Sequence, residues 1–595
     1  MHPVTLALLA ALTHSAPTSA RSPSAMLAKL VEDDWQYELS ASPTWASILG
    51  DRRFDDRWDD LSPEGIEARH RHDVETVAAL DALLGGKLSA EDRLNAGLLR
   101  KDHAWRAEAH DLGWQFLTTN HMGGLPEGLR ELPGVQTAWE LGGQLPFASA
   151  AEYEAWVRRL ERFGTYVDQV VALMREGIRK KLVHPRILVQ RIPPQIDRLL
   201  VAAPEGSGFY APFRAFPASV AEADRARLSA AGAAAIRSSV LPALARFRDF
   251  VAGEYLAAAP EQVGAWQWPR GAEIYAYWAR RSTTTDRTPD ELHALGLSEV
   301  ARIRGEMEKA KEATGFLGSL ADFFELLRKD PRFYHPTPEA LLLHYRDLAK
   351  RIDPTLPRLF RTLPRAPYGV EPTPSEMAPD VTTGFYVPGS GDGLRPGTYL
   401  VNLHRPETRP RWEMVPLTLH EAVPGHHLQV SLAAEQTGLP AFRRFGYHTA
   451  YGEGWALYAE TLGGELGLLD DPYDRFGQLA YEMWRAVRLV VDTGLHVRRW
   501  TRARALAYFL ENSPRQELDA TNEIDRYIAV PGQALAYKVG EMEIRAMRRR
   551  AEQALGERFD VRAFHDVVLL GGSLPLDALR ARVEAWVEAE RSRAR

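Results

Sequence analysis

Residues 417–429 read Leu417-Thr-Leu-His-Glu-Ala-Val-Pro-Gly-His-His-Leu-Gln429, and this stretch decides how the rest of the chain is interpreted. Helical patterning begins at about Val415, and a helix that carries His-Glu followed by another His is typical of zinc hydrolases. In such enzymes two imidazoles hold the ion and the glutamate takes a proton from water. We therefore expect His420 to be a metal ligand and Glu421 to be the catalytic base.

The second histidine stands unusually far from the first. In the common arrangement the two are four residues apart, whereas His426 is six and His427 seven residues after His420. In a continuous helix position i+6 lies about 240° around and about 9 Å along the axis, so the two rings could not share an ion. Pro424 removes a backbone donor and Gly425 tolerates unusual dihedral angles, so we expect the helix to break there. We favour His426 as the second ligand, with His427 as the alternative ligand or a hydrogen-bond donor to one.

A third ligand is expected from the helical segment 450–460. The chain contains no cysteine, so any metal must be held by His, Asp or Glu. Glu453 lies 27 residues after His426, which is enough for one helix to end and a second to return alongside it. Glu460 is the alternative ligand, or a carboxylate that orients an imidazole. The sequence thus predicts one zinc ion bound by His420, His426 and Glu453, with a fourth position open to water.

Four sequence blocks in the same order resemble the bacterial domain-of-unknown-function family 885 over nearly the whole mature chain. They are residues 420–429, 453–458, 488–496 and 531–538. That family resembles the helical zinc peptidases with a glutamate ligand, such as angiotensin-converting enzyme, thimet-type oligopeptidases and dipeptidyl peptidase III. Those enzymes place Gly immediately before the second His ligand, a parallel that favours His426. The resemblance implies zinc-dependent hydrolysis of peptide bonds.

Several other residues are candidates for contacts with the substrate. Asn402 belongs to an apolar run, 398–403, that is either an edge strand pairing with substrate backbone or a structural strand of a small sheet. Arg488, Asp492 and His496 share a helical face. The resemblance places them near the site, where they would hold a substrate terminus or orient a ligand; the alternative is a buried ion pair between helices.

The group that stabilises the oxyanion is left open by the sequence. Tyr537 and Lys538 follow Pro-Gly-Gln, and a hydroxyl or a cation aimed at the scissile carbonyl would serve. Tyr447 and His448, just before Glu453, compete for the same role. We expect Tyr537 and His448 as catalytic candidates and Lys538 as a substrate contact.

Most of the chain has helical periodicity, whereas residues 365–410 are rich in Pro, Gly and Thr with short apolar runs. We expect a mainly α-helical protein with a deep cleft and a small β-sheet beside the metal-binding helix. Residues 1–20 contain an apolar run and then small residues, which predicts a signal peptide. The remaining 21–595 would form one zinc-peptidase-like domain, with 21–360 as a helical cleft wall and 361–595 as the metal-site part.

Composition limits the partners of the protein. The net charge of −6 and the sequence pI near 6.3 give no basic footprint for nucleic acid. No segment has 18 uninterrupted apolar residues, so no transmembrane segment is expected. With the predicted signal peptide the location would be periplasmic or secreted, and otherwise cytoplasmic. We expect hydrolysis of short peptides; the alternatives are a zinc-dependent esterase or amidase on a non-peptide substrate and a non-catalytic metal-binding or peptide-binding protein.

Overall fold

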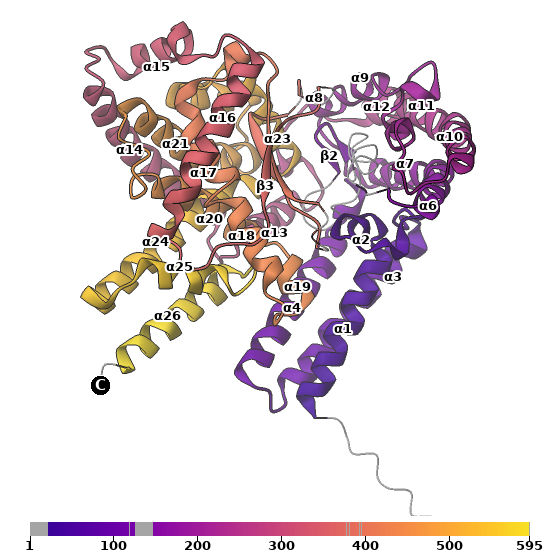
Figure 1. Ribbon diagram of the computed structural model, residues 1–595, viewed down its shortest axis with the longest axis horizontal. Coiled ribbons are helices and arrows are strands. Elements are labelled where there is room, and N and C mark those ends of the chain that lie inside the picture. Colours follow the sequence, from indigo (N-terminus) through magenta and orange to yellow (C-terminus); the bar gives the residue numbers. More distant parts are fainter. Residues whose placement is uncertain are drawn as a thin grey trace, which may run out of the picture.

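The computed structural model describes residues 22–593 except 118, 125–144, 146, 376–377, 380, 392 and 394. The expected signal peptide, residues 1–20, lies outside the described residues. The described chain is mainly α-helical with a small three-stranded sheet, as the sequence predicts (Figure 1). One hydrophobic cluster extends from Trp58 to Val583, so both ends of the chain share a core.

The first part of the chain forms long helical hairpins and a group of shorter helices, indigo to magenta in Figure 1. Several of these helices begin with Ser followed by Pro, because the serine side chain caps a free backbone N–H and proline suits the first turn. The helices are α1 (Pro23–Ala41), α2 (Pro43–Leu49), α3 (Pro63–Leu84), α4 (Ala90–Asp111), α6 (Ala150–Glu161), α7 (Phe163–Lys180), α8 (Arg186–Val189), α9 (Ile192–Asp197), α10 (Glu222–Ala235), α11 (Leu241–Phe250) and α12 (Leu256–Ala258). The two-residue strands β1 (Thr119–Asn120) and β2 (Gly123–Gly124) pair antiparallel.

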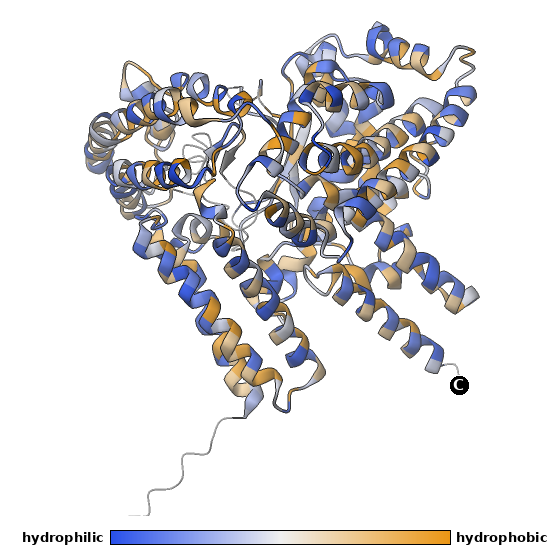
Figure 2. Ribbon diagram, turned by 180° about the vertical axis from the view of Figure 1, so that it is seen from behind, coloured by the Kyte–Doolittle hydropathy of each residue, from blue (hydrophilic) through white to orange (hydrophobic). Residues whose placement is uncertain are grey.

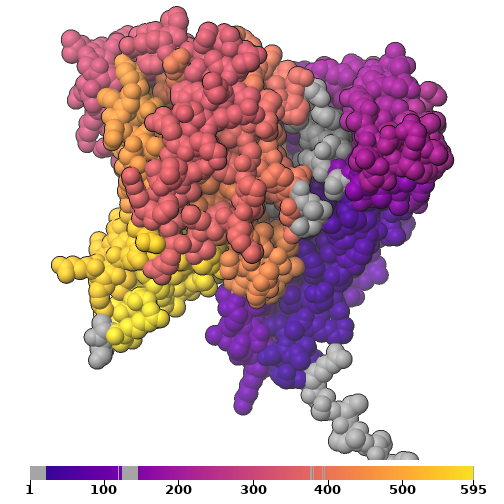
Figure 3. Space-filling view, viewed as in Figure 1, coloured from indigo at the N-terminus to yellow at the C-terminus, as the bar shows by residue number. Residues whose placement is uncertain are grey.

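The second part is built around a buried central helix, α21 (Pro472–His496), along which α14 (Pro289–Ala313) packs. Helix α20 (Thr449–Leu462) lies against α24 (Ala536–Leu555), and the two approach closely because Gly454 and Gly540 face each other without side chains. The remaining helices are α13 (Gly271–Thr283), α15 (Leu320–Lys329), α16 (Pro338–Ile352), α17 (Met414–Glu421), α18 (His426–Glu435), α19 (Ala441–Phe445), α22 (Arg502–Asn512), α23 (Glu517–Ala529), α25 (Val561–Leu569) and α26 (Leu576–Ser592). Figure 3 shows this part, red to yellow, in contact with the first part.

The small sheet has the order β3–β5–β4, with β3 (Tyr368–Pro372) parallel and β4 (Gly384–Val387) antiparallel to β5 (Gly397–Val401). It contacts α17 and α18, so it lies beside the helices that carry the histidines, as expected. Strand β5 is paired on both sides, so the expectation of a substrate-binding edge strand at 398–403 is wrong. Its other interpretation, a structural strand, is confirmed, and the free edge on this side belongs to β4.

Hydrophilic and hydrophobic residues alternate along the long helices in Figure 2, as expected for helices with one buried face. Among the described residues, one helical run, Glu222–Ala258, is long and apolar enough to cross a membrane by length and composition alone. Its helices α10 and α11 pack against α6, α7 and α9, as a core helix does. This run is therefore weak evidence for a membrane span.

Candidate metal centre

The polypeptide breaks between the two histidines of the decisive segment. Helix α17 ends at Glu421, a cis Val423–Pro424 peptide follows, and α18 begins at His426. A Cβ atom at Gly425 would lie 1.9 Å from the carbonyl oxygen of His420, so only glycine fits this turn. The predicted break at Pro424–Gly425 is confirmed.

The break brings three candidate ligands together. The ligand atoms of His420, His426 and Glu453 all lie within 4.8 Å of one another. Oε2 of Glu453 is 3.5 Å from Nε2 of His420 and 3.3 Å from Nε2 of His426. Two ligands of a tetrahedral zinc ion with bonds of about 2.0–2.1 Å are about 3.3 Å apart. Glu453 therefore lies at the spacing that suits a zinc ion from both histidines, and the three residues supply the nitrogen and oxygen donors that zinc prefers.

The alternative ligands lie outside this triad. Oε1 of Glu460 accepts a hydrogen bond from Nδ1 of His420 at 2.8 Å, which turns the other ring nitrogen toward Glu453. His427 points elsewhere: its Nε2 donates to the carbonyl oxygen of Ala366 and its Nδ1 accepts from the Tyr386 hydroxyl. Burial also lowers the pKa of His427 to about 4, so its ring is neutral. Glu460 is placed to orient a ligand, and His427 to fix the start of α18.

The pKa values of His420, Glu453 and Glu421 are shifted by burial and by neighbouring charges. Burial opposes ionisation of His420, but hydrogen bonds to Glu453 and Glu460 outweigh it and raise its pKa to about 9. Burial would also raise the pKa of Glu453, yet the neighbouring imidazoles hold it well below its ordinary value. Burial raises the pKa of Glu421, and the imidazoles offset only part of that effect. Glu421 is therefore a poorly solvated carboxylate beside the candidate metal ligands.

The triad opens into a cavity of about 470 Å³. Glu421 lines it, and so do Gly384, Phe385 and Tyr386 of the edge strand β4. Most of the wall comes from residues 382–573, whereas 21–360 contributes only Trp45 and Leu49 of α2 among its described residues. The expected cleft thus lies mainly within the C-terminal part.

Two of the oxyanion candidates line this cavity. The ring of Tyr537 lies nearly parallel to that of His420, with centroids 6.4 Å apart. Its hydroxyl accepts a hydrogen bond from Arg526 at 2.9 Å. Tyr447 also lines the cavity, and its ring lies against Gly452 on α20. The geometry therefore keeps both tyrosines as candidates.

His448 and Asn402 do not belong to the cavity wall, which corrects their predicted roles. His448 precedes α20 and its buried ring faces Trp105 edge-on at 6.2 Å. The side-chain amide of Asn402 donates to the carbonyl oxygens of Ala378 and Thr382. Its side chain therefore holds the loop before β4 rather than a substrate.

His496 and Lys538 are also structural. His496 accepts a hydrogen bond from the backbone N–H of Ala265 and donates to the carbonyl oxygen of Tyr527. The buried Lys538 ammonium contacts the carboxylates of Glu299, Glu482 and Glu541, at 3.1, 2.8 and 2.9 Å. Both side chains hold helices together, but His496 does so through backbone hydrogen bonds and not through the buried ion pair considered for it. Arg488 lines the cavity and also forms a buried ion pair with Glu523 at 2.9 Å.

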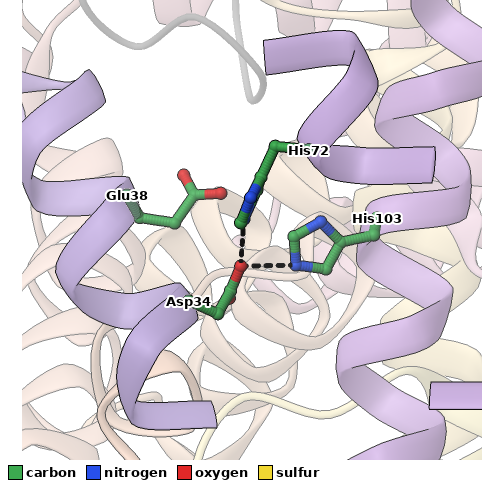
Figure 4. Close-up of side chains that lie close together, drawn as sticks. All are labelled: Asp34, Glu38, His72 and His103. Atoms are coloured by element: carbon green, nitrogen blue, oxygen red, sulfur yellow. Dashed lines mark hydrogen bonds and ion pairs between the residues drawn. The ribbon is translucent and has the colours of Figure 1, made fainter. Parts of the chain in front are cut away.

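A second cluster of histidines and carboxylates, none of which lines this cavity, lies between α1, α3 and α4 (Figure 4). Oδ1 of Asp34 is 2.7 Å from Nε2 of His72 and 3.1 Å from Nε2 of His103. The Arg106 guanidinium pairs with Glu38 and Asp73 at 2.8 Å each. Because a fixed cation already balances these carboxylates, the cluster is an ion-pair network that holds three helices together.

Replacing Asp34 by alanine is expected to lower the free energy of unfolding by about 3–5 kcal/mol, because His72 and the buried His103 lose the carboxylate that they share and His103 keeps only Asp73 among the described carboxylates. Asp33→Ala is the matched control, since Asp33 pairs with Lys29 on the exposed side of the same helix and should cost less than about 1 kcal/mol. Urea unfolding and metal analysis are the measurements. Loss of bound metal in the Asp34 variant would contradict a purely structural network.

Comparison with known proteins places the fold. No curated protein matches the chain. A crystal structure of a "putative lipoprotein" from Colwellia psychrerythraea is similar with a TM-score of 0.89 and 28% identity, covering 96% of this chain and all of that one. A "putative lipoprotein of unknown function" from Shewanella oneidensis shares the fold at a TM-score of 0.67 and 17% identity, covering 94% and 99% of the two chains. The family model described as bacterial protein of unknown function (DUF885) matches residues 43–583, and the chain therefore belongs to that family.

Proposed function

We propose that the protein is a zinc-dependent hydrolase of peptide bonds in short peptides, with the ion held by His420, His426 and Glu453. The observation that carries the proposal is the convergence of these donors, with Glu453 at tetrahedral spacing from both histidines, in the wall of a cavity that Glu421 also lines. Two histidines and a glutamate leave a fourth position open, which is the pattern of catalytic rather than structural zinc sites.

A zinc ion in this donor set supplies Lewis acidity toward a carbonyl oxygen and makes a nearby water molecule more acidic. Glu421 takes a proton from the attacking water and returns it to the leaving amine. Tyr537 accepts from Arg526, so its own hydroxyl proton can be donated to the developing oxyanion. Glu460 keeps the His420 ring oriented throughout.

Substrate shape follows from the cavity and its edge strand. A cavity of about 470 Å³ suits a ligand of a few residues. Among the described residues, β4 pairs on one side only and lines the cavity, so an extended peptide can add to its other side as a further strand. Main-chain hydrogen bonds of this kind favour peptides over other amides and esters.

The location that we propose is outside the cytoplasm. Two similar structures carry the name putative lipoprotein, and the apolar run at residues 4–12 of this chain is followed by small residues. A periplasmic or secreted protein fits both observations.

Metal analysis joined to a peptide-library digest read by mass spectrometry tests the proposal. We expect about one zinc per chain and cleavage of library peptides. His426→Ala should lose the zinc. Replacing a residue that only hydrogen-bonds to a metal ligand typically lowers metal affinity about 10–100-fold, and removing a ligand should lower it further. His427→Gln is the matched control and should keep it, since that ring faces Ala366 and Tyr386. Stoichiometric zinc without any cleavage would favour a binding protein, and cleavage of esters alone would favour the esterase alternative.

A further inference from the structure

One side of the cavity carries four arginines. Arg485 and Arg488 belong to α21, Arg515 precedes α23, and Arg526 lies on α23; all four line the cavity that the metal triad lines. We call these four residues the arginine wall. The first and last of them, Arg485 and Arg526, are 41 residues apart in sequence, and the packing of α23 against α21 brings them together.

Two aromatic rings hold the arginine wall in place. The guanidinium carbons of Arg485, Arg488 and Arg515 lie 4.3, 4.4 and 3.8 Å from the centre of the Trp484 ring. Arg488 also lies 4.2 Å from the centre of the Tyr537 ring. Cation–π contacts of this kind fix the guanidinium planes without using their N–H groups.

The carboxylates behind the wall are mostly shared. Glu523 contacts Arg488 at 2.9 Å and Arg526 at 3.6 Å. Among the carboxylates of the described residues, Arg485 pairs only with Glu460, at 3.4 Å, and that carboxylate already accepts a hydrogen bond from His420.

The partners of Arg515 are equally weak. Asp519, 3.8 Å from Arg515, is also 3.4 Å from Arg409. Glu413 lies 3.4 Å from Arg515, and burial raises the pKa of Glu413, which weakens it as a counter-charge. The arginine wall therefore holds closely packed positive charges, and the carboxylates that neutralise them are each shared with another cationic group or weakened.

Two guanidinium nitrogens of the wall are left unpaired. Nη1 of Arg488 and Nε of Arg485 have no hydrogen-bond partner among the described residues, although their side chains are only 1% and 4% exposed. An unpaired N–H on a buried charged group is unfavourable, and protein interiors rarely retain one. The described residues therefore leave part of the hydrogen-bonding capacity of these two guanidinium groups unused, although both side chains line the cavity.

We propose that the arginine wall binds a carboxylate of the substrate. Guanidinium forks match the two oxygens of a carboxylate, and a desolvated pocket strengthens the interaction. The Tyr537 ring lies between the wall and His420, 6.4 Å from the His420 ring, so the carboxylate sits within about three residues of extended chain from the bond to be cleaved. This inference rests on the proposed function and adds a substrate class, namely peptides with an acidic side chain or a free C-terminus at that distance.

Four probes separate the two sources of the carboxylate: Ala-Ala-Glu, Ala-Ala-Gln and the C-terminal amide of each. Binding to Glu421→Gln protein is measured by calorimetry, and cleavage by wild-type protein is measured as kcat/KM. We expect the probe that keeps the recognised carboxylate to have an affinity and a kcat/KM about tenfold or more higher than the probe in which that carboxylate is an amide. Loss on amidation assigns the wall to the C-terminus, and loss on Glu to Gln replacement assigns it to a side chain.

Variants of the wall then test the assignment. Arg488→Lys keeps a charge for Glu523 but loses the fork, and Arg526→Gln changes a side chain that is 18% exposed, so one of them should fold normally. Either is expected to reduce the preference for the carboxylate by about tenfold. Arg475→Gln on the same helix is the control and should keep the full preference, because the Arg475 side chain donates to Gln478 and neither residue lines the cavity.

The results also separate this inference from the proposed function. Peptide cleavage with no carboxylate preference, or with an unchanged preference in both wall variants, overturns the arginine wall and leaves the hydrolase standing. Arginine-dependent binding of the acidic probes without any cleavage overturns the hydrolase and supports the wall. If the protein shows no cleavage and no preferential binding, both the hydrolase and the arginine wall are overturned.

Discussion

Glu421→Gln is expected to abolish peptide hydrolysis while the zinc stays bound. The amide keeps the size of the carboxyl group but cannot accept a proton, and loss of a positioned base costs about 10²–10⁴-fold in rate. Glu421 ends α17 immediately after a candidate ligand and lines the cavity, so its carboxylate has access to a water molecule there. The rate is measured on the best-cleaved library peptide, and the zinc by metal analysis of the same sample.

Glu465→Gln serves as the control for this experiment. Glu465 is an exposed glutamate that pairs with Arg548 beyond the end of α20, so its replacement should leave both rate and zinc unchanged. If the Glu421 variant cleaves peptides at the wild-type rate, Glu421 is not the base. If it loses its zinc as well as its activity, the role of Glu421 lies in holding the site together.

Gly425→Ala is expected to disrupt both the zinc site and the fold around it. The new Cβ would lie 1.9 Å from the His420 carbonyl oxygen and 2.4 Å from that of Leu419, and both atoms are backbone that cannot move aside alone. Relief requires α17 and α18 to separate, which displaces His426 from His420. We expect the free energy of unfolding to fall by about 3 kcal/mol or more, with loss of zinc.

Gly438→Ala is the matched control, because a Cβ there meets nothing within 4 Å. This change should leave the free energy of unfolding unchanged or raise it by up to about 1 kcal/mol, because alanine lowers the conformational entropy of the unfolded chain. Urea unfolding and metal analysis of the two variants decide the matter. Wild-type zinc content in Gly425→Ala would mean that the histidines do not depend on this break.

Local sequence determined a large part of the metal-binding segment. The helix break followed from Pro424 and Gly425 alone, because a missing N–H and a missing Cβ act on the nearest turn of the chain. The break alone did not choose between His426 and His427, and the resemblance to peptidases with Gly before the second His ligand favoured His426. The mainly helical fold was equally accessible, since hydrophobic periodicity is a property of neighbouring residues.

The supporting residues depended on packing between distant segments. The sequence marked 398–403 as a strand, but only pairing with both β3 and β4 made it central and left β4 at the edge. Spacing put His496 on the same face as Arg488, yet α21 is buried on all sides, so one residue reached the cavity and the other did not.

The sequence by itself determined the candidate ligands, the helix break between them and the helical class, because each depends on residue chemistry, covalent geometry or periodicity within one segment. The tertiary structure alone decided that Glu460 orients His420, that His427 and Lys538 turn away, and that four arginines face one cavity. The reason is physical: the direction of a side chain is fixed by what packs against its helix, and for α21 those neighbours come from segments as distant as α14 and α23.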